Sequence, residues 1–336
     1  MPAHRFGESQ PFSVGIEEEL FVLDAETLEP ASVPDGVLDG VRLKAELFTT
    51  MLELATGVCA DVAQAVDELA ALRVEARRRL DAHGLELAAA GTWPTAVLGE
   101  QPVTPLEPLR RFAEYAGPSA LRQHCSGLHV HVGVSSPEEC MGRLEAVLPL
   151  LPAVLALSAN SPYADGAETG LASTRAELLQ LLPRAGAPPP FRDYEEFLGF
   201  AELLVELGLA DDLMRLWWDV RPHPRLGTLE IRAPDQPTRL ADTAALAGLC
   251  HVLVVAADPA AARADRGLYA QNRWAAARFG AQAGLIHPET RELTTPQELL
   301  GGVDGLDQAG EQLAIGRSDG LRALRERLVA LTYDQL

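Results

Sequence analysis

The chain has 336 residues, of which 47% are hydrophobic and 23% charged, the balance of an ordinary soluble globular protein with one large domain or two smaller ones. Its formal net charge of −20 argues against nucleic acid as a general partner, because such a surface needs an excess of lysine and arginine. We expect a cytoplasmic protein that spans no membrane. No apolar run approaches ~20 residues without charge or proline, the N-terminus has no signal-peptide core, and the four cysteines form no CxxC pair.

Alternating apolar and polar residues predict two strands in the N-terminal part, over 12–24 and 44–56. Apolar positions three and four apart then predict a helix from Asp61 that Gly84 closes. The later elements are predicted in this order: a buried strand over 84–92, a helix near 107–122, a strand over 127–134, a long helix from Pro137 bent or split by Pro149 and Pro152, a helix over 193–208, strands within 216–222 and 227–234, and helices after Leu240. This order predicts an α/β or α+β sheet with helices on one side, and we expect a single domain over 1–336.

Two glutamates of the first strand, Glu17 and Glu19, share one face, whereas Glu18 points to the other. Neighbouring carboxylates repel each other unless a positive charge lies between them. A wet edge strand would tolerate the pair, but the apolar flanks of this strand favour a central position. A hard divalent cation is then the expected partner.

Two further glutamates, Glu46 and Glu53, lie in the second predicted strand. Their odd spacing places them on opposite faces of a regular strand, so a bulge or a turn is needed to bring them together. One ligand and one surface carboxylate is the alternative.

The stretch GLHVHVGV places His129 and His131 on one strand face, with valines on the other. A single buried histidine is usually structural, but two in register indicate a ligand site. The same HxH spacing is also found in zinc sites, so the spacing does not identify the metal.

The stretch GTLEIRAPD places Glu230 and Arg232 on one face, either as an internal ion pair or as a metal ligand beside an anion site. Arg221 and Arg225 flank the turn just before it, and three arginines within twelve residues favour an anion site. The chain has no phosphate-binding glycine loop and no GxSxG motif, so a nucleotide would have to bind through metals and arginines.

Several stretches together resemble the carboxylate-amine ligase family, also called glutamate–cysteine ligase type 2. They are VGIEEELFVLDAETLEP, MLELATGVCADV, AAGTWP, CSGLHVHVGV, LSANSPY, WWDVRPHPRLGTLEIRAPDQPT and NRWAAARFG. The ExE strand, the glutamate before Ala-Thr, the HxH strand and the I-E-x-R-x-P-D strand also resemble glutamine synthetases. The resemblance implies an α+β fold, with a curved, mainly antiparallel sheet and helices on its convex side. One departure is Trp93, where we expect a histidine.

The resemblance also implies roles for the residues above. Glu19, Glu46 and Glu53 would hold one magnesium or manganese ion, and Glu17, His129 and Glu230 a second that bridges the phosphates of ATP. His131 would support the nucleotide, and Arg232 would contact the phosphoryl group or the substrate carboxylate. The implied reaction joins a small-molecule carboxylate, glutamate, to an amine, nominally cysteine, through an acyl phosphate. A homo-oligomer is compatible with the sequence.

Two other classes of function stay open from the residues alone. A zinc hydrolase would use the HxH strand together with later histidines, but His223 and His251 fall in a turn and in a predicted helix. A non-catalytic binder would retain the fold and lose the ligands, yet all the expected carboxylates are present.

Overall fold

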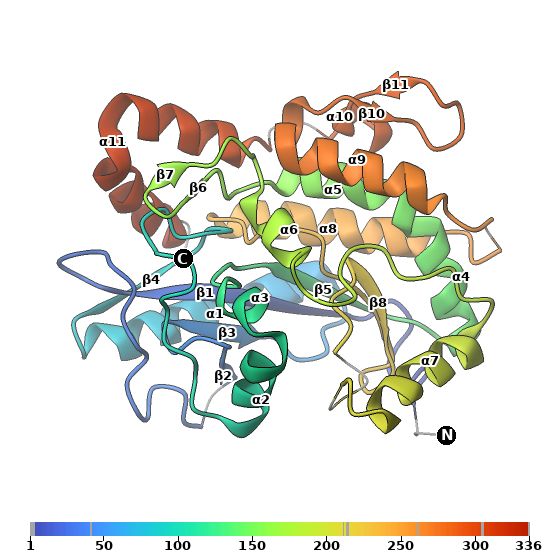
Figure 1. The fold of residues 1–336 in the computed structure, drawn as a ribbon, viewed down its shortest axis with the longest axis horizontal. Helices are drawn as coiled ribbons and strands as arrows, with labels where there is room; N and C mark the ends of the chain where they lie inside the picture. The colour runs from blue at the N-terminus through green and yellow to red at the C-terminus, as the bar shows by residue number, and fades with distance from the viewer. Residues whose placement is uncertain are drawn as a thin grey trace.

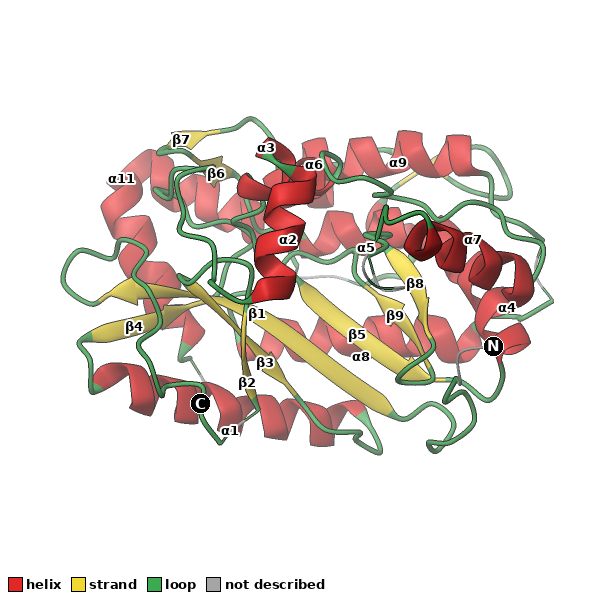
Figure 2. Cartoon of the chain, turned by 60° about the horizontal axis from the view of Figure 1, so that its bottom comes forward, coloured by secondary structure: helices red, strands yellow, loops and turns green. Residues whose placement is uncertain are grey.

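One large antiparallel sheet organises the computed structural model, which describes residues 4–40, 42–210, 212, 215–260, 262–303 and 306–334 (Figures 1 and 2). Its strands are β1 Val14–Asp24, β2 Leu43–Ala45, β3 Met51–Ala55, β4 Leu85–Ala88, β5 Leu128–Gly133, β8 Val220–His223 and β9 Thr228–Ile231. They are ordered β2-β3-β1-β5-β9-β8, and β4 pairs with the end of β1. Two small hairpins lie apart from it, β6 Tyr163–Ala164 with β7 Ala167–Glu168, and β10 Leu285–Ile286 with β11 Leu293–Thr294.

Helices cover the sheet on one face and close the site on the other (Figure 2). They are α1 Val62–Asp81, α2 Glu107–Ala116, α3 Pro118–Leu121, α4 Pro137–Val147, α5 Leu151–Ser158, α6 Thr174–Leu179, α7 Tyr194–Glu206, α8 Leu240–Ala256, α9 Arg266–Phe279, α10 Pro296–Leu299 and α11 Gln308–Thr332, with short 3-10 turns η1 Leu148–Leu150 and η2 Gly280–Gln282. Helices α1 and α8 pack against each other, α1 also against β1 and β4, and α8 against β5. The predicted α+β fold, a mainly antiparallel sheet backed by helices, is confirmed.

The two faces of β1 have different environments because successive side chains of a strand point in opposite directions. Ile16, Leu20 and Val22 are fully buried in the main core with the apolar residues of α1 and α8. On the other face, the glutamates give way to Phe21 and Leu23, which belong to a second core. The alternation therefore turns Glu17 and Glu19 away from α1 and α8, whereas Glu18 points toward these helices.

The predicted strand over 44–56 is wrong as a single element. The segment forms β2 and β3, which pair as a hairpin with Lys44 opposite Glu53. The predicted helix near 107–122 is also divided, because Gly117 has φ +53° and Pro118 begins a new turn. The long helix from Pro137 is split at η1, as its prolines predict.

Among the described residues, one segment is long and apolar enough to cross a membrane, Pro137–Ser158. It is 78% buried within the protein, as expected of core helices.

Trp93 is also a core residue: its ring is fully buried near Phe21, and its indole N–H donates to the Leu28 carbonyl at 2.9 Å. The Trp93 side chain therefore packs in the core and turns no polar group toward the site.

Candidate active site

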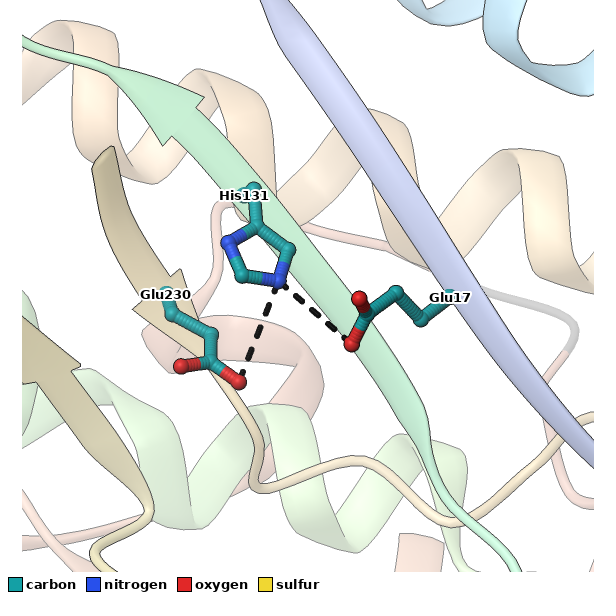
Figure 3. Close-up of side chains that lie close together, drawn as sticks. All are labelled: Glu17, His131 and Glu230. Atoms are coloured by element: carbon teal, nitrogen blue, oxygen red, sulfur yellow. Dashed lines mark ion pairs between the residues drawn. The ribbon is translucent and has the colours of Figure 1, made fainter. Parts of the chain in front are cut away.

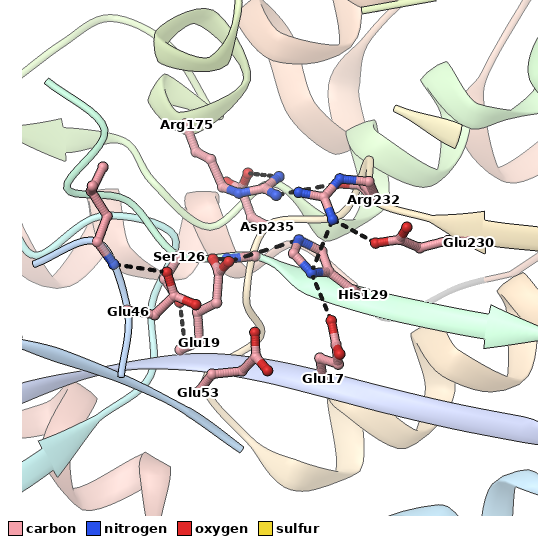
Figure 4. A network of polar contacts seen from close by, with 12 residues as sticks. Glu17, Glu19, Glu46, Glu53, Ser126, His129, Arg175, Glu230, Arg232 and Asp235 are labelled. Carbon is pink, nitrogen blue, oxygen red and sulfur yellow. Dashed lines mark hydrogen bonds and ion pairs between the residues drawn. The ribbon is translucent and has the colours of Figure 1, made fainter. Parts of the chain in front are cut away.

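The site is built on the face of the sheet that looks away from α1 and α8 (Figure 4). Pairing of β1 with its two neighbours sets Glu19 opposite Glu53 of β3 and Glu17 opposite His129 of β5. Directly opposed residues lie on the same face of a sheet. The register therefore gathers three carboxylates and an imidazole.

A compact three-residue cluster lies at the β9 end of this face (Figure 3). His131 lies opposite Glu230 in the β5–β9 pair. The Nε2 atom of His131 is 3.6 Å from Glu17 Oε2 and 3.8 Å from Glu230 Oε1, and all three ligand atoms lie within 4.8 Å of one another. These separations suit three ligands of one divalent ion, since each would lie about 2.0–2.2 Å from it.

His129 lies in the middle of the site. Its Nδ1 is 3.5 Å from both Glu17 Oε2 and Arg232 Nη1, and its Nε2 is 3.9 Å from Glu19 Oε1. The resemblance implied His129 as the partner of Glu17 and Glu230, whereas the structure places His131 between those two carboxylates. Both histidines therefore lie near Glu17, and the structure adds His131 as a candidate ligand beside Glu230, while the role of His129 stays a prediction.

The donor set fits a divalent cation. The Nε2 atoms of His129 and His131 are buried and have no hydrogen-bond partner among the described residues. A buried polar atom without a partner is costly, and a metal ion would relieve that cost. Burial alone would raise the pKa of Glu17, but the two neighbouring histidines hold that pKa well below its ordinary value.

The hairpin of β2 and β3 supplies the turn that Glu46 needs to reach the site. Burial, together with the charges of Glu19 and Glu53, raises the pKa of Glu46 well above its ordinary value. Burial and the Glu17 charge raise the pKa of Glu53 to about 7, against the opposing effect of Lys44. Two carboxylates with raised pKa values mark a place where negative charge lacks compensation, which a cation would supply.

Lys44 was not identified from the sequence, although it is the single lysine in a chain with 27 arginines. Its ammonium lies 2.5 Å from Glu53 Oε1 and 3.5 Å from Glu17 Oε1. The single lysine of the chain thus lies beside two carboxylates of the site.

Glu230 is held by two arginines. Arg221 Nε lies 2.5 Å from Glu230 Oε2, and Arg232 Nη1 lies 2.5 Å from Glu230 Oε1. Burial would raise the pKa of Glu230, but the two guanidinium groups hold it well below its ordinary value. The internal ion pair is therefore present, and both arginines also line the cleft above the glutamates.

The prediction that Arg225 belongs to the anion site is wrong. Arg225 is exposed in the turn between β8 and β9, and its Nη2 lies 2.6 Å from Asp212 Oδ2. It does not line the cleft. Two residues of a hairpin share a face only while the strands continue, and Arg225 lies beyond the end of β8.

Arg175 of α6 enters the site from a distant part of the sequence. Its guanidinium donates to the carbonyls of Arg232 and Ala233 and lies 3.8 Å from Asp235. A Cβ atom at Gly127 would lie 2.1 Å from the Arg175 Nη2, so the glycine before the HxH strand makes room for this arginine. No local pattern distinguishes Arg175 from the other arginines, so it could not be identified from the sequence.

These residues surround a cleft of about 230 Å³ that contains all four site glutamates of β1, β3 and the hairpin turn. Its walls include His129, Arg175, Arg215, Arg221 and Arg232. A second hollow of about 250 Å³ shares Glu17 with it and is lined by hydroxyl groups and His131. Glu17 therefore stands between two spaces, one rich in arginine and one rich in hydroxyl groups.

The sequence profile of the glutamate-cysteine ligase family 2 (GCS2) matches residues 13–334. A protein of Rubrobacter xylanophilus named "Putative glutamate--cysteine ligase 2-3" is 42% identical over 84% of this chain and 79% of its own length. One from Sorangium cellulosum, named "Putative glutamate--cysteine ligase 2", is 36% identical over 86% of this chain and 81% of its own.

Among solved structures, the fold is similar to the glutamate–cysteine ligase of Francisella tularensis in complex with AMP. The TM-score is 0.69 at 14% identity, over 97% of this chain and 90% of that one. A bifunctional glutathione synthetase from Pasteurella multocida gives a TM-score of 0.63 at 16% identity, over 96% of this chain and 50% of that one. Profile, relatives and fold agree, and the chain belongs to the glutamate–cysteine ligase family 2.

Proposed function

We propose that this protein is an ATP-dependent ligase that joins the γ-carboxylate of glutamate to an amine, nominally cysteine. The observation that carries the proposal is the cluster of Glu17, His131 and Glu230 with Arg221 and Arg232 around it. Cations bound by carboxylates, together with guanidinium groups, are what phosphoryl transfer requires. Family membership and the AMP bound to the Francisella ligase support the use of ATP.

The proposed reaction has two steps, phosphorylation of the carboxylate and attack by the amine. The substrate carboxylate attacks the γ-phosphorus of ATP, which gives an acyl phosphate and ADP. The amine then attacks the acyl carbon, and phosphate and a proton leave as the amide forms. A free carboxylate is a poor acyl donor because its leaving group would be oxide, and phosphorylation removes that obstacle.

The residues present fit magnesium or manganese at two places. Glu17, His131 and Glu230 would hold one ion, and Glu19, Glu46 and Glu53 a second, with His129 between them. Such ions supply charge neutralisation for the phosphates. Oxygen-rich ligand sets favour these hard cations over zinc, although each set borders a histidine.

The protein's own side chains would position the reactants. Arg232 and Arg221 line the cleft beside Glu230 and would stabilise charge on the transferring phosphoryl group. The hollow beyond Glu17, with Ser13, Thr56 and Thr228 in its walls, would receive the nucleotide. The arginine-rich cleft would receive the carboxylate substrate.

We further propose that the chain acts as one catalytic domain in the cytoplasm, with small-molecule substrates and without nucleic acid or membrane partners. The site draws on β1, β3, β5, β9 and α6, which span residues 14 to 231 of the chain. A division of that span would separate ligands of one ion.

The test is ADP release with glutamate and ATP, with hydroxylamine as a small amine that traps the acyl phosphate as a hydroxamate. We expect hydroxamate formation that needs magnesium or manganese and survives a zinc-selective chelator. Loss of activity with that chelator and rescue by zinc alone would favour a zinc hydrolase. Neither ADP release nor hydrolysis with any acid or amine would indicate a non-catalytic binder.

A further inference from the structure

A third cleft, of about 530 Å³, adjoins the arginine-rich one and has no part in the chemistry described above. The two clefts share Phe112, Arg215 and Trp217 in their walls. None of these residues lines the hollow beyond Glu17. The third cleft, called the side cleft below, therefore opens from the carboxylate end of the site, away from the space assigned to the nucleotide.

The size of the side cleft exceeds what cysteine needs. Cavities of about 300–1,000 Å³ typically hold ligands of drug size, and the side cleft falls in that range. The catalytic cleft of about 230 Å³ must already take the carboxylate substrate. A ligand that fills both clefts thus extends well beyond the reacting atoms.

The walls of the side cleft combine aromatic faces with guanidinium groups. The rings of Phe112 and Trp217 stack at 4.8 Å with 26° between their planes. The Arg215 guanidinium lies 5.1 Å from the Phe112 ring, and that of Arg184 lies 5.9 Å from the Trp217 ring. Aromatic side chains in a cleft wall suit an apolar or aromatic body, and arginines suit a carboxylate.

Charge in the side cleft is opposite to that of the protein. Its described lining includes Arg111, Arg184 and Arg215 against the single carboxylate of Glu114. The chain as a whole has a formal net charge of −20. A local excess of cations in such a chain favours an anionic ligand at this place.

Arg184 is held in a costly backbone conformation. Its φ of +62° lies in the left-handed region, which residues other than glycine and asparagine seldom adopt. Its guanidinium donates to the Arg215 carbonyl at 3.2 Å and to the Leu209 carbonyl at 3.5 Å, across the cleft wall. Strained residues of this kind collect at ligand sites.

Resting on the proposed ligase function, we infer that the side cleft binds the amine acceptor, and that this acceptor carries a carboxylate of its own and an apolar or aromatic body. Amino acids with large side chains and short peptides with a free carboxyl end have this chemistry. The amino group would point toward the acyl phosphate between Glu17 and Arg232. The acceptor's carboxylate would lie among Arg184, Arg215 and Arg111.

The experiment compares amines in pairs that differ only in their carboxylate, such as phenylalanine with phenethylamine, using ADP release with glutamate and ATP. We expect kcat/KM to be at least about tenfold higher for the carboxylated member, as for a charge-assisted contact. Equal values for both members would overturn the inference. Hydroxamate formation with hydroxylamine reports the ligase function separately: its absence with every acid overturns the ligase function and the inference with it.

The variant Arg184→Asn removes the guanidinium while keeping a residue that tolerates the left-handed conformation. We expect the preference for the carboxylated amine to fall to within about threefold, through KM rather than kcat. Arg111→Gln, whose guanidinium is exposed and 3.8 Å from Glu107, should reduce the preference in the same direction. Arg322→Asn, on an exposed turn of α11, is the matched control and should keep it.

Two outcomes of these variants would contradict the inference. If Arg184→Asn raises KM equally for both members of each pair, the arginine only supports the loop. If it raises KM for ATP about tenfold and leaves the amine preference intact, the side cleft holds the nucleotide instead.

Discussion

The Glu18 carboxylate and the Arg73 guanidinium form a doubly hydrogen-bonded ion pair, with both side chains fully buried, on the face of β1 opposite the candidate active site. Arg73 Nη2 lies 2.7 Å from Glu18 Oε1, and Arg73 Nε lies 2.8 Å from Glu18 Oε2. Gln236 and Thr243 donate to the same carboxylate at 2.8 and 2.7 Å. The pair ties β1 to α1 and α8 directly beneath the site.

Glu18→Gln should therefore lower stability and leave the chemistry of the folded protein largely intact. The substitution leaves the buried Arg73 without its counter-charge, which typically costs about 3–5 kcal/mol. Urea unfolding should show this loss, while ADP release per folded molecule stays near the parent value. A variant as stable as the parent would contradict the argument. Glu326→Gln, at an exposed pair on α11, is the matched control and should change neither quantity.

Glu230→Gln should lower activity and also stability, because it leaves Arg221 and Arg232 without the carboxylate that pairs with them. It removes one negative charge from the place where the proposed cation would meet the two arginines. The loss of such a neutralising group typically costs ~3–4 kcal/mol in the transition state, or roughly two to three orders of magnitude in rate. The measurement is ADP release at saturating magnesium, with manganese titration to follow the affinity for the ion. Normal turnover by this variant would contradict the proposed role of Glu230 in the active site.

Glu53 should contribute a loss of stability to the metal-free protein as pH rises from about 5 to 7. Its pKa of about 7 in the folded protein exceeds the ordinary value of a glutamate, so the folded form binds a proton that the unfolded form has released. Stability then falls between the two pKa values, by at most about 3 kcal/mol for this group.

Urea unfolding in the presence of a chelator, at several pH values, measures this slope. Glu53→Gln should flatten it relative to the parent, since the amide does not titrate. Saturating magnesium at pH 8 should restore stability to the parent by mass action. Equal slopes for the two proteins would show that Glu53 is not the group responsible.

Lys44 offers a chemical probe of cation binding because the chain has no other lysine. A cation that engages Glu17 and Glu53 would release the ammonium group from both. Burial would lower the pKa of Lys44, but Glu53 raises it above its ordinary value, so release should also bring the amine closer to its reactive neutral form. Amine acylation, followed by mass spectrometry, should therefore be several-fold faster with magnesium.

The terminal amine of the same chain is the internal control, and its rate of acylation should not respond to magnesium. Slower labelling of Lys44 in the presence of the ion would mean that Lys44 becomes covered when the site fills. That result would contradict the expected displacement.

The sequence by itself determined which side chains share a strand face. The spacing of two places Glu17 with Glu19, His129 with His131, and Glu230 with Arg232, because the period of a β-strand is a local property of the backbone. The same periodicity, together with the order of elements, predicted a sheet backed by helices, whereas the antiparallel arrangement was implied by the family resemblance.

Only the tertiary structure decided which of these faces meet, and through which atoms. The β2–β3 hairpin turns Glu46 inward, the β8–β9 turn leaves Arg225 in solvent, and α6 delivers Arg175 from far along the chain. The place of His131 beside Glu230 follows from the register between β5 and β9. Register, turn geometry and helix docking are set by packing between distant segments, and no local pattern of residues encodes them.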